Sequence, residues 1–340
     1  MDTIEARRSS AARRLLPGLA PVIALAAVAT LAGHAVPVVG GPAFAILGGI
    51  GVSLFWPPSD RTRPGLAFAS RSVLQAAIVV LGTGLSLRQV AATGTASLPV
   101  LAGTLTVALL GAAVIGRLMG IPRDLRTLIG VGTGICGASA IAATDAVIAA
   151  PEADVSYAIA TIFTFNVAAV LTFPTLGRLI GLSPHGFGLW AGTAVNDLSS
   201  VVAASTIFGH GATSYAVVVK LTRTLMIIPI CIVLSAWRSR RLAQADGPRR
   251  GWAGQLRRAV PMFIAWFLVA VIANTAGLVP GSWHGSLTQA AQAMITAALA
   301  AIGLSTRAKD IRRAGLRPLA LGALLWALVA LSSVGLQAVV

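Results

Sequence analysis

Apolar runs of about twenty residues follow one another along most of the chain, separated by short clusters of Gly, Pro and charged residues. A transmembrane α-helix needs about 20 mostly apolar residues, whereas a membrane β-strand would alternate over about ten. The pattern therefore predicts an all-α polytopic membrane protein. Its breaks define eleven expected spans, near residues 15–33, 40–56, 66–86, 97–117, 127–149, 155–178, 187–208, 214–237, 259–279, 286–305 and 317–339.

Composition supports a chain that lies almost wholly in the membrane. Hydrophobic residues make up 56% and charged residues 11% of the 340, whereas a soluble domain carries about 25% charged residues. We predict a single transmembrane domain over residues 1–340, with a cytoplasmic tail at 1–14 and a basic cytoplasmic loop at 238–258. The first apolar run resembles a signal peptide, but it is long and no small-residue cleavage site follows, so we expect a retained span.

The net charge of +16 is explained by topology. If the N-terminus is cytoplasmic, 23 of the 26 Lys and Arg residues fall on the cytoplasmic side of the eleven spans. The positive-inside rule then predicts a cytoplasmic N-terminus and a periplasmic C-terminus. The expected partner of the basic surface is the lipid bilayer, and no nucleic-acid partner is expected.

Several classes of activity lack their motifs. The chain has no G-x-x-x-x-G-K-[ST] phosphate loop, no H-E-x-x-H and no G-x-S-x-G. Its two cysteines lie in apolar runs and form neither a disulfide framework nor a metal-ligand spacing. We therefore expect no enzyme, no nucleotide-driven pump, no cofactor and no metal site.

The predicted span 187–208 carries polar residues at bilayer depth. It contains Asn196, Asp197, Ser199 and Ser200. An ionisable group there costs roughly 2.5–3.5 kcal/mol on insertion scales, so it marks a functional site by default. On a continuous helix Asn196 and Asp197 would each share a face with Ser200. Asn166 adds a buried amide in the span before it.

The next span adds two cations. Lys220 and Arg223 are three residues apart, so a helix places them on one face. One interpretation is an ion pair between Asp197 and one of them, which still leaves one positive charge. The other is a binding site for an anion, because arginine matches oxyanions with a bidentate fork.

The predicted span 127–149 contains glycines and small polar residues near its middle. Gly134, Cys136, Gly137 and Ser139 lie in this stretch. Such a composition suits a discontinuous helix whose free N–H groups and positive dipole end face an anionic substrate. Close helix packing through small residues would give the same composition, and both interpretations stay open.

Internal repetition is faint. The stretch Gly132–Thr144 aligns without gaps to Gly192–Ala204, and Gly84–Arg88 is similar to Gly303–Arg307. With eleven full spans the first pair would run parallel and the second pair antiparallel. The two pairings imply different repeat offsets, so at least one is coincidence.

Five segments resemble the YeiH-type family of bacterial inner-membrane proteins, called sulfate exporters. They are Gly132–Ala143, Tyr157–Pro174, Gly188–Ala204, Val219–Pro229 and Ala300–Leu319. That family is grouped with transporters of the sodium/proton antiporter and bile-acid symporter type. The resemblance implies the bacterial inner (plasma) membrane and an inverted-repeat transporter with discontinuous crossed helices.

Together these observations predict a secondary active transporter that exports a small anion such as sulfate, sulfite or an organosulfonate. Export would be coupled to a proton or sodium gradient, with Asp197 as the ion-coupling residue. The alternative is a monovalent cation/proton antiporter that uses the adjacent Asn196 and Asp197. Nothing in the sequence decides the oligomeric state, and a homodimer stays open. The expected substrate-binding residues are Gly134, Cys136, Gly137, Ser139, Asn166, Asn196, Ser199, Ser200, Lys220 and Arg223.

Overall fold

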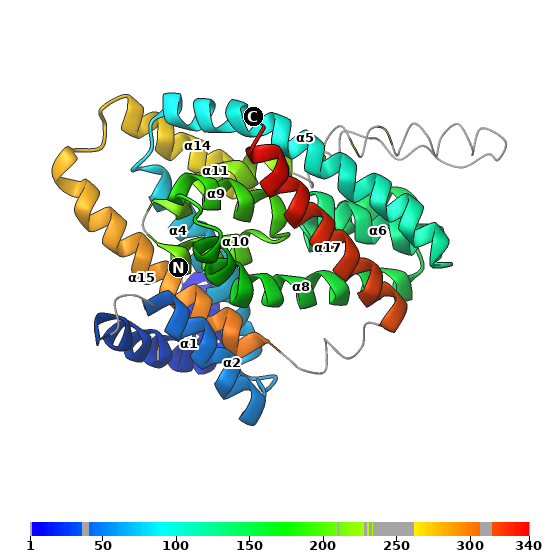
Figure 1. Cartoon of the computed structure of the whole chain (residues 1–340). Coiled ribbons are helices and arrows are strands. Elements are labelled where there is room, and N and C mark those ends of the chain that lie inside the picture. Colours follow the sequence, from blue (N-terminus) through cyan, green and yellow to red (C-terminus); the bar gives the residue numbers. More distant parts are fainter. Residues whose placement is uncertain are drawn as a thin grey trace. The chain divides into compact units, whose positions relative to one another are not determined.

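A computed structural model describes residues 2–35, 41–209, 211–227, 262–306 and 315–339, together with residues 230 and 233. All regular structure in these ranges is helical, and they contain no strand (Figure 1). The predicted all-α class is therefore confirmed. The predicted basic loop at 238–258 lies outside the described residues.

Six helical segments of the described chain are long and apolar enough to cross a membrane. Their number is smaller than the eleven predicted spans, so the prediction of about eleven transmembrane helices is not confirmed. Most of the remaining predicted spans correspond to shorter helices. The six segments are Arg14–Gly33, Arg63–Gly82, Leu87–Leu118, Glu152–Leu179, Gly281–Ser305 and Leu316–Gln337.

The helices group into two compact units. One unit comprises the described residues within 1–87 and 263–308, and the other those within 88–262 and 309–340. The prediction of a single transmembrane domain stays a prediction.

The first unit is built around α15, which packs against α1, α2, η1 and α4. Gly49 of α2 and Gly303 of α15 allow the backbones of the two helices to touch. A Cβ on Gly49, for example, would lie 2.8 Å from the carbonyl oxygen of Ala300. Its elements are α1 (Asp2–Ala35), α2 (Gly41–Phe55), α3 (Arg63–Phe68), η1 (Ala69–Val73), α4 (Leu74–Gly82), α14 (Met262–Thr275), η2 (Gly281–Trp283) and α15 (His284–Ser305).

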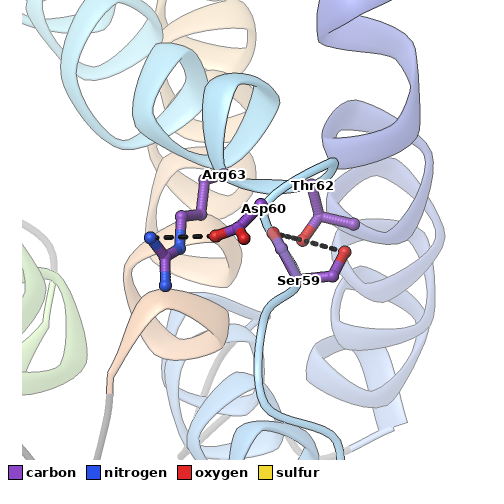
Figure 2. A network of polar contacts seen from close by, with 4 residues as sticks. All are labelled: Ser59, Asp60, Thr62 and Arg63. Atoms are coloured by element: carbon purple, nitrogen blue, oxygen red, sulfur yellow. Dashed lines mark hydrogen bonds and ion pairs between the residues drawn. The ribbon is translucent and has the colours of Figure 1, made fainter.

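A polar turn joins α2 to α3 in this unit (Figure 2). The guanidinium of Arg63 lies 3.0 Å from the carboxylate of Asp60, and the hydroxyl of Thr62 donates to the carbonyl oxygen of Ser59. Both charged side chains are exposed, and such surface pairs contribute about 0–1 kcal/mol. The turn therefore orients the start of α3 and adds little to stability.

The second unit holds every predicted site residue. Its central helix is α8, which packs against α6, α7, α10 and α17. The elements are α5 (Leu87–Leu118), α6 (Arg123–Gly134), α7 (Ala138–Ile148), α8 (Glu152–Leu179), α9 (Pro184–Ala194), α10 (Leu198–Phe208), α11 (Ala212–Leu225) and α17 (Leu316–Gln337).

Aromatic stacking fixes α17 and α9 against α8. The ring of Phe173 on α8 is stacked between Trp190 of α9, at 4.1 Å, and Trp326 of α17, at 5.4 Å. The indole N–H of Trp190 also donates to the carbonyl oxygen of Ala330 at 3.0 Å. Offset aromatic pairs are worth about 0.5–1.5 kcal/mol beyond the area they bury. This cluster gives α9 a rigid support next to the candidate site.

Candidate functional site

The predicted span 187–208 is a helical hairpin. Helix α9 ends at Ala194, three non-helical residues follow, and α10 begins at Leu198. The rings of Phe187 on α9 and Phe208 on α10 stack at 3.9 Å, although a straight helix would separate them by about 30 Å. The chain therefore enters and returns at the same end, and the prediction of a full span here is wrong.

The predicted span 127–149 is a second hairpin. Helix α6 ends at Gly134 and α7 begins at Ala138, and a Cβ on Gly132 would meet the side chain of Ile141 at 3.0 Å. At the turn Gly137 has φ 68° and ψ −130°, a conformation that is open to glycine and costly for other residues. The discontinuous-helix interpretation is therefore confirmed, but the expected full crossing is wrong.

The two hairpins point toward each other from opposite ends of α8. The open end of the first hairpin packs near the start of α8, where Leu125 and Ile148 share a cluster with Val155. The open end of the second lies near the end of α8, where Arg178 donates to the carbonyl oxygens of Ile207 and Phe208. The first arms α6 and α9 therefore run in opposite directions, and the expectation that the two repeats are parallel is wrong.

The hairpin tips meet beside the middle of α8. The side-chain oxygen of Asn166 accepts a hydrogen bond from the backbone N–H of Asn196 at 3.2 Å. A Cβ on Gly137 would lie 3.5 Å from the carbonyl oxygen of Asn196. The predicted polar residues of three separate segments are thus brought to one place.

Lys220 connects the two tips. Its ammonium nitrogen donates to the carbonyl oxygen of Ile135 at 2.8 Å and to that of Val195 at 2.7 Å. These two residues follow α6 and α9 directly and occupy equivalent positions in the alignment of Gly132–Thr144 with Gly192–Ala204. The side chain is fully buried.

Arg223 closes the same two helix ends. Its guanidinium donates to the carbonyl oxygens of Thr133, at 2.8 Å, and Gly134, at 2.6 Å, and also to that of Thr193. Thr133 and Thr193 are again equivalent positions of the two repeats. The last carbonyl groups of a helix have no intrahelical partner and carry partial negative charge. Both cations therefore neutralise the C-terminal ends of α6 and α9.

Asp197 caps the helix that follows. Its carboxylate accepts from the backbone N–H groups of Ser199, at 3.0 Å, and Ser200, at 3.4 Å, and from the Ser199 hydroxyl. Asp197 has extended backbone and is the N-cap of α10. The interpretation of Asn196, Asp197 and Ser200 as one face of a continuous helix is therefore wrong, because the helix is broken between them.

The two cations have no carboxylate partner. Among the described residues no ion pair joins Asp197 to Lys220 or to Arg223, so the ion-pair interpretation is not borne out. Their partners are five neutral carbonyl oxygens. The site accordingly holds two basic side chains and one carboxyl group, with an excess of one positive charge when all three are ionised.

The positive end of α7 is open. The N-cap residue of α7 is Gly137, which has no side chain to cap the helix, and the thiol of Cys136 lies against the backbone N–H of Ala140 in the first turn. Ser139 is exposed, whereas Cys136, at 8% exposure, is nearly buried. Free N–H groups at a helix N-terminus bind anions. The N-terminal end of α7 is thus the part of the first tip that a ligand can approach.

Two buried oxygens at the tips have no hydrogen-bond partner among the described residues. They are the side-chain oxygen of Asn196 and the hydroxyl of Thr133, and both residues are at most 1% exposed. A buried polar group without a partner costs about 1–3 kcal/mol. A bound ion or water would relieve this cost.

The structure therefore gathers the predicted residues at the two tips and on α8 and α11, and Ser139 lies at their exposed margin. Sequence reasoning missed the carbonyl oxygens of Thr133, Ile135, Thr193 and Val195. No side-chain type marks such backbone ligands. The gap-free alignment of the two glycine-containing stretches was the one available signal, because it pairs these four residues by position.

These features define a polytopic α-helical membrane protein with two opposed helical hairpins. Residues 17–322 match the family model described as conserved hypothetical protein 698, and the chain belongs to this family. It is 41% identical over 332 residues to a UPF0324 membrane protein of Streptococcus pyogenes serotype M3, covering 95% of this chain and 97% of the relative. A UPF0324 membrane protein of Streptococcus agalactiae serotype V is 40% identical over 331 residues, with the same coverage. The resemblance to the YeiH-type family is thereby confirmed.

Proposed function

We propose that this protein is a secondary active transporter that exports a small anion of the sulfate, sulfite or organosulfonate type. The two opposed hairpins would form the substrate site between their tips. Discontinuous helices in transporters serve this purpose, because their free backbone groups replace the water around an ion at the bilayer midplane. Membership of a membrane protein family and the absence of a catalytic motif in the sequence support a transporter over an enzyme.

One observation indicates that the substrate is negatively charged. Lys220 and Arg223 are fully buried and, among the described residues, hydrogen-bonded to carbonyl groups alone, without a carboxylate partner. They lie at the negative ends of α6 and α9, whereas the positive end of α7 begins at Gly137, which has no side chain to cap it. Electrostatically, an anion is the ligand that this arrangement favours.

The oxyanion would bind at the start of α7. The backbone N–H groups of Ala138 and Ser139 would donate to it, and Gly137 would allow it to approach the backbone closely. Cys136 and the amide of Asn196 would line the adjoining space. Asp197 already occupies the equivalent N-terminus of α10, so the second tip holds an internal carboxylate where the first would hold the substrate.

We infer that α6, α7 and α8 form one half of an inverted repeat and α9, α10 and α11 the other half. Each hairpin returns to the side from which it enters, so the chain would cross the membrane nine times in place of eleven. The N-terminus stays cytoplasmic and the C-terminus periplasmic, in the bacterial inner membrane. Only Arg178 among the basic loop residues changes side, so 22 of the 26 Lys and Arg residues still lie inside.

Anion flux into proteoliposomes tests the proposal. The purified full chain would be reconstituted and assayed with labelled sulfate and methanesulfonate. Lys220→Ala and Arg223→Ala should each abolish uptake, whereas Arg178→Ala, which changes an exposed arginine at the end of α8, should not. Uptake that persists unchanged in both site variants would exclude the cations from the mechanism.

One observation favours a second function, a monovalent cation/proton antiporter. The side-chain oxygen of Asn196 is a buried acceptor without a partner in the described part of the chain, and Asn196 directly precedes Asp197. Such oxygens suit a sodium ion. Sodium- or potassium-driven proton movement in everted vesicles, lost in Asp197→Asn, would support this function. Anion transport that neither cation drives would exclude it.

A further inference from the structure

The nitrogen of Lys220 has fewer acceptors than a charged lysine needs. A protonated amine has three N–H donors, and a neutral amine has two. Lys220 makes two hydrogen bonds, to Ile135 and Val195, one at each hairpin tip. Within the described part of the chain nothing accepts a third. The site as it stands therefore matches the donor count of the neutral amine.

Arg223 differs from Lys220 because it cannot exist as a neutral group in the site. Its guanidinium stays protonated in proteins and makes three hydrogen bonds to carbonyl oxygens. It lies one helical turn from Lys220, so two charged groups would repel at a depth where no carboxylate pairs with either. The other ionisable groups facing Lys220 are the thiol of Cys136 and the carboxyl of Asp197. Arg223 is thus a permanent charge, and Lys220 is the cation that can lose its proton.

Asp197 is poorly placed to carry a transported proton. Its carboxylate caps α10 through two backbone N–H groups and the hydroxyl of Ser199. Protonation would weaken the cap and so destabilise the second hairpin tip.

We propose that Lys220 carries the coupling proton, and that the substrate anion supplies the third acceptor that its ammonium group lacks. This inference rests on the proposed anion transport. The neutral amine takes a proton from water on the side to which the site is open, and its third N–H donates to an oxygen of the anion. On the opposite side the anion leaves and the proton returns to water. One proton accompanies each anion, so a monovalent sulfonate moves without net charge. Export by this route is driven by the outward concentration gradient of the anion, because an inward proton gradient opposes it.

The pH dependence of anion binding by the full-length wild-type protein tests this step. Methanesulfonate and sulfate are suitable probes, and calorimetry in detergent would give both the affinity and the proton uptake. Because binding and protonation are linked, affinity should rise about tenfold for each unit by which the pH falls while the amine is mostly neutral. Close to one proton should be taken up for each anion bound.

Two variants distinguish the carrier. Lys220→Gln keeps two N–H donors in a group that does not titrate, so its affinity should be weak and independent of pH. In Asp197→Asn the affinity should still rise about tenfold for each unit by which the pH falls, whatever the absolute affinity of this variant. Size-exclusion elution of each variant would verify folding. If Lys220→Gln does not fold, proton uptake that persists in Asp197→Asn supports Lys220, and uptake that is lost there assigns the proton to Asp197.

The remaining outcomes separate this inference from the function on which it rests. Binding in the wild type without pH dependence or proton uptake would overturn the role of Lys220 and leave anion transport standing. A pH dependence of affinity that is lost in Asp197→Asn and kept in Lys220→Gln would assign the proton to Asp197 and would also overturn the role of Lys220. Absence of anion binding to the wild type at any pH would remove the proposed function itself.

Discussion

Replacing Arg223 with methionine keeps an apolar stem of similar length and removes all the donors that close the ends of α6 and α9. Three buried carbonyl oxygens, those of Thr133, Gly134 and Thr193, would then lose their partner. At about 1 kcal/mol for each orphaned group, the loss is about 3 kcal/mol. For a unit of this size that corresponds to a fall in melting temperature of about 6–12 °C.

The matched control is Arg178→Met. Arg178 also donates to two carbonyl oxygens at a helix end, those of Ile207 and Phe208, but it is exposed and water can replace it. We expect a fall of about 4 °C or less, since exposed polar contacts contribute about 0–1 kcal/mol. Thermal unfolding of both purified variants in the same detergent gives the comparison. Equal shifts in the two variants would refute the conclusion that Arg223 holds the two hairpin tips together.

Three further substitutions test the tips. Gly137→Ala forces a side chain into φ 68° and ψ −130°, so we expect the free energy of chemical unfolding to fall by about 1–3 kcal/mol. The control Gly51→Ala, with open space around it, should be neutral. Equal losses in both variants would contradict the backbone strain at Gly137. Asp197→Ala removes the cap of α10 and should lower the stability by about 0.5–2 kcal/mol, whereas Asp197→Asn should retain most of that stability. Identical melting curves for the two variants would argue against capping. Asn166→Leu leaves the N–H of Asn196 without its acceptor and should cost about 1–3 kcal/mol; a neutral effect would mean that water reaches this group.

The polar residues of the site could be predicted because their chemistry is visible in the sequence. Lys220, Arg223 and Asp197 stand out in apolar runs, since burying an ionisable group is costly. A break near Gly134–Ser139 was one of two interpretations of glycines that weaken a helix, the other being close helix packing. The break before Asp197 was not, although an Asp followed by two serines and an apolar run is a helix N-cap pattern.

The partners of the cations could not be predicted. The sequence suggested an ion pair with Asp197. Instead, Lys220 and Arg223 bind five backbone carbonyl oxygens, those of Thr133, Gly134, Ile135, Thr193 and Val195. Any residue type can offer such an oxygen. Only the arrangement of two broken helices around α11 decides which ones are close enough.

The sequence by itself determined that this is an all-helical membrane protein with buried charges in its middle, because hydropathy and the cost of ionisable groups act along the chain. The tertiary structure decided that two of the apparent spans are hairpins. A run of about twenty apolar residues has the same composition whether it crosses the membrane or turns back halfway. The direction of α9 relative to α10 depends on contacts such as Phe187 against Phe208, which join residues far apart along the chain.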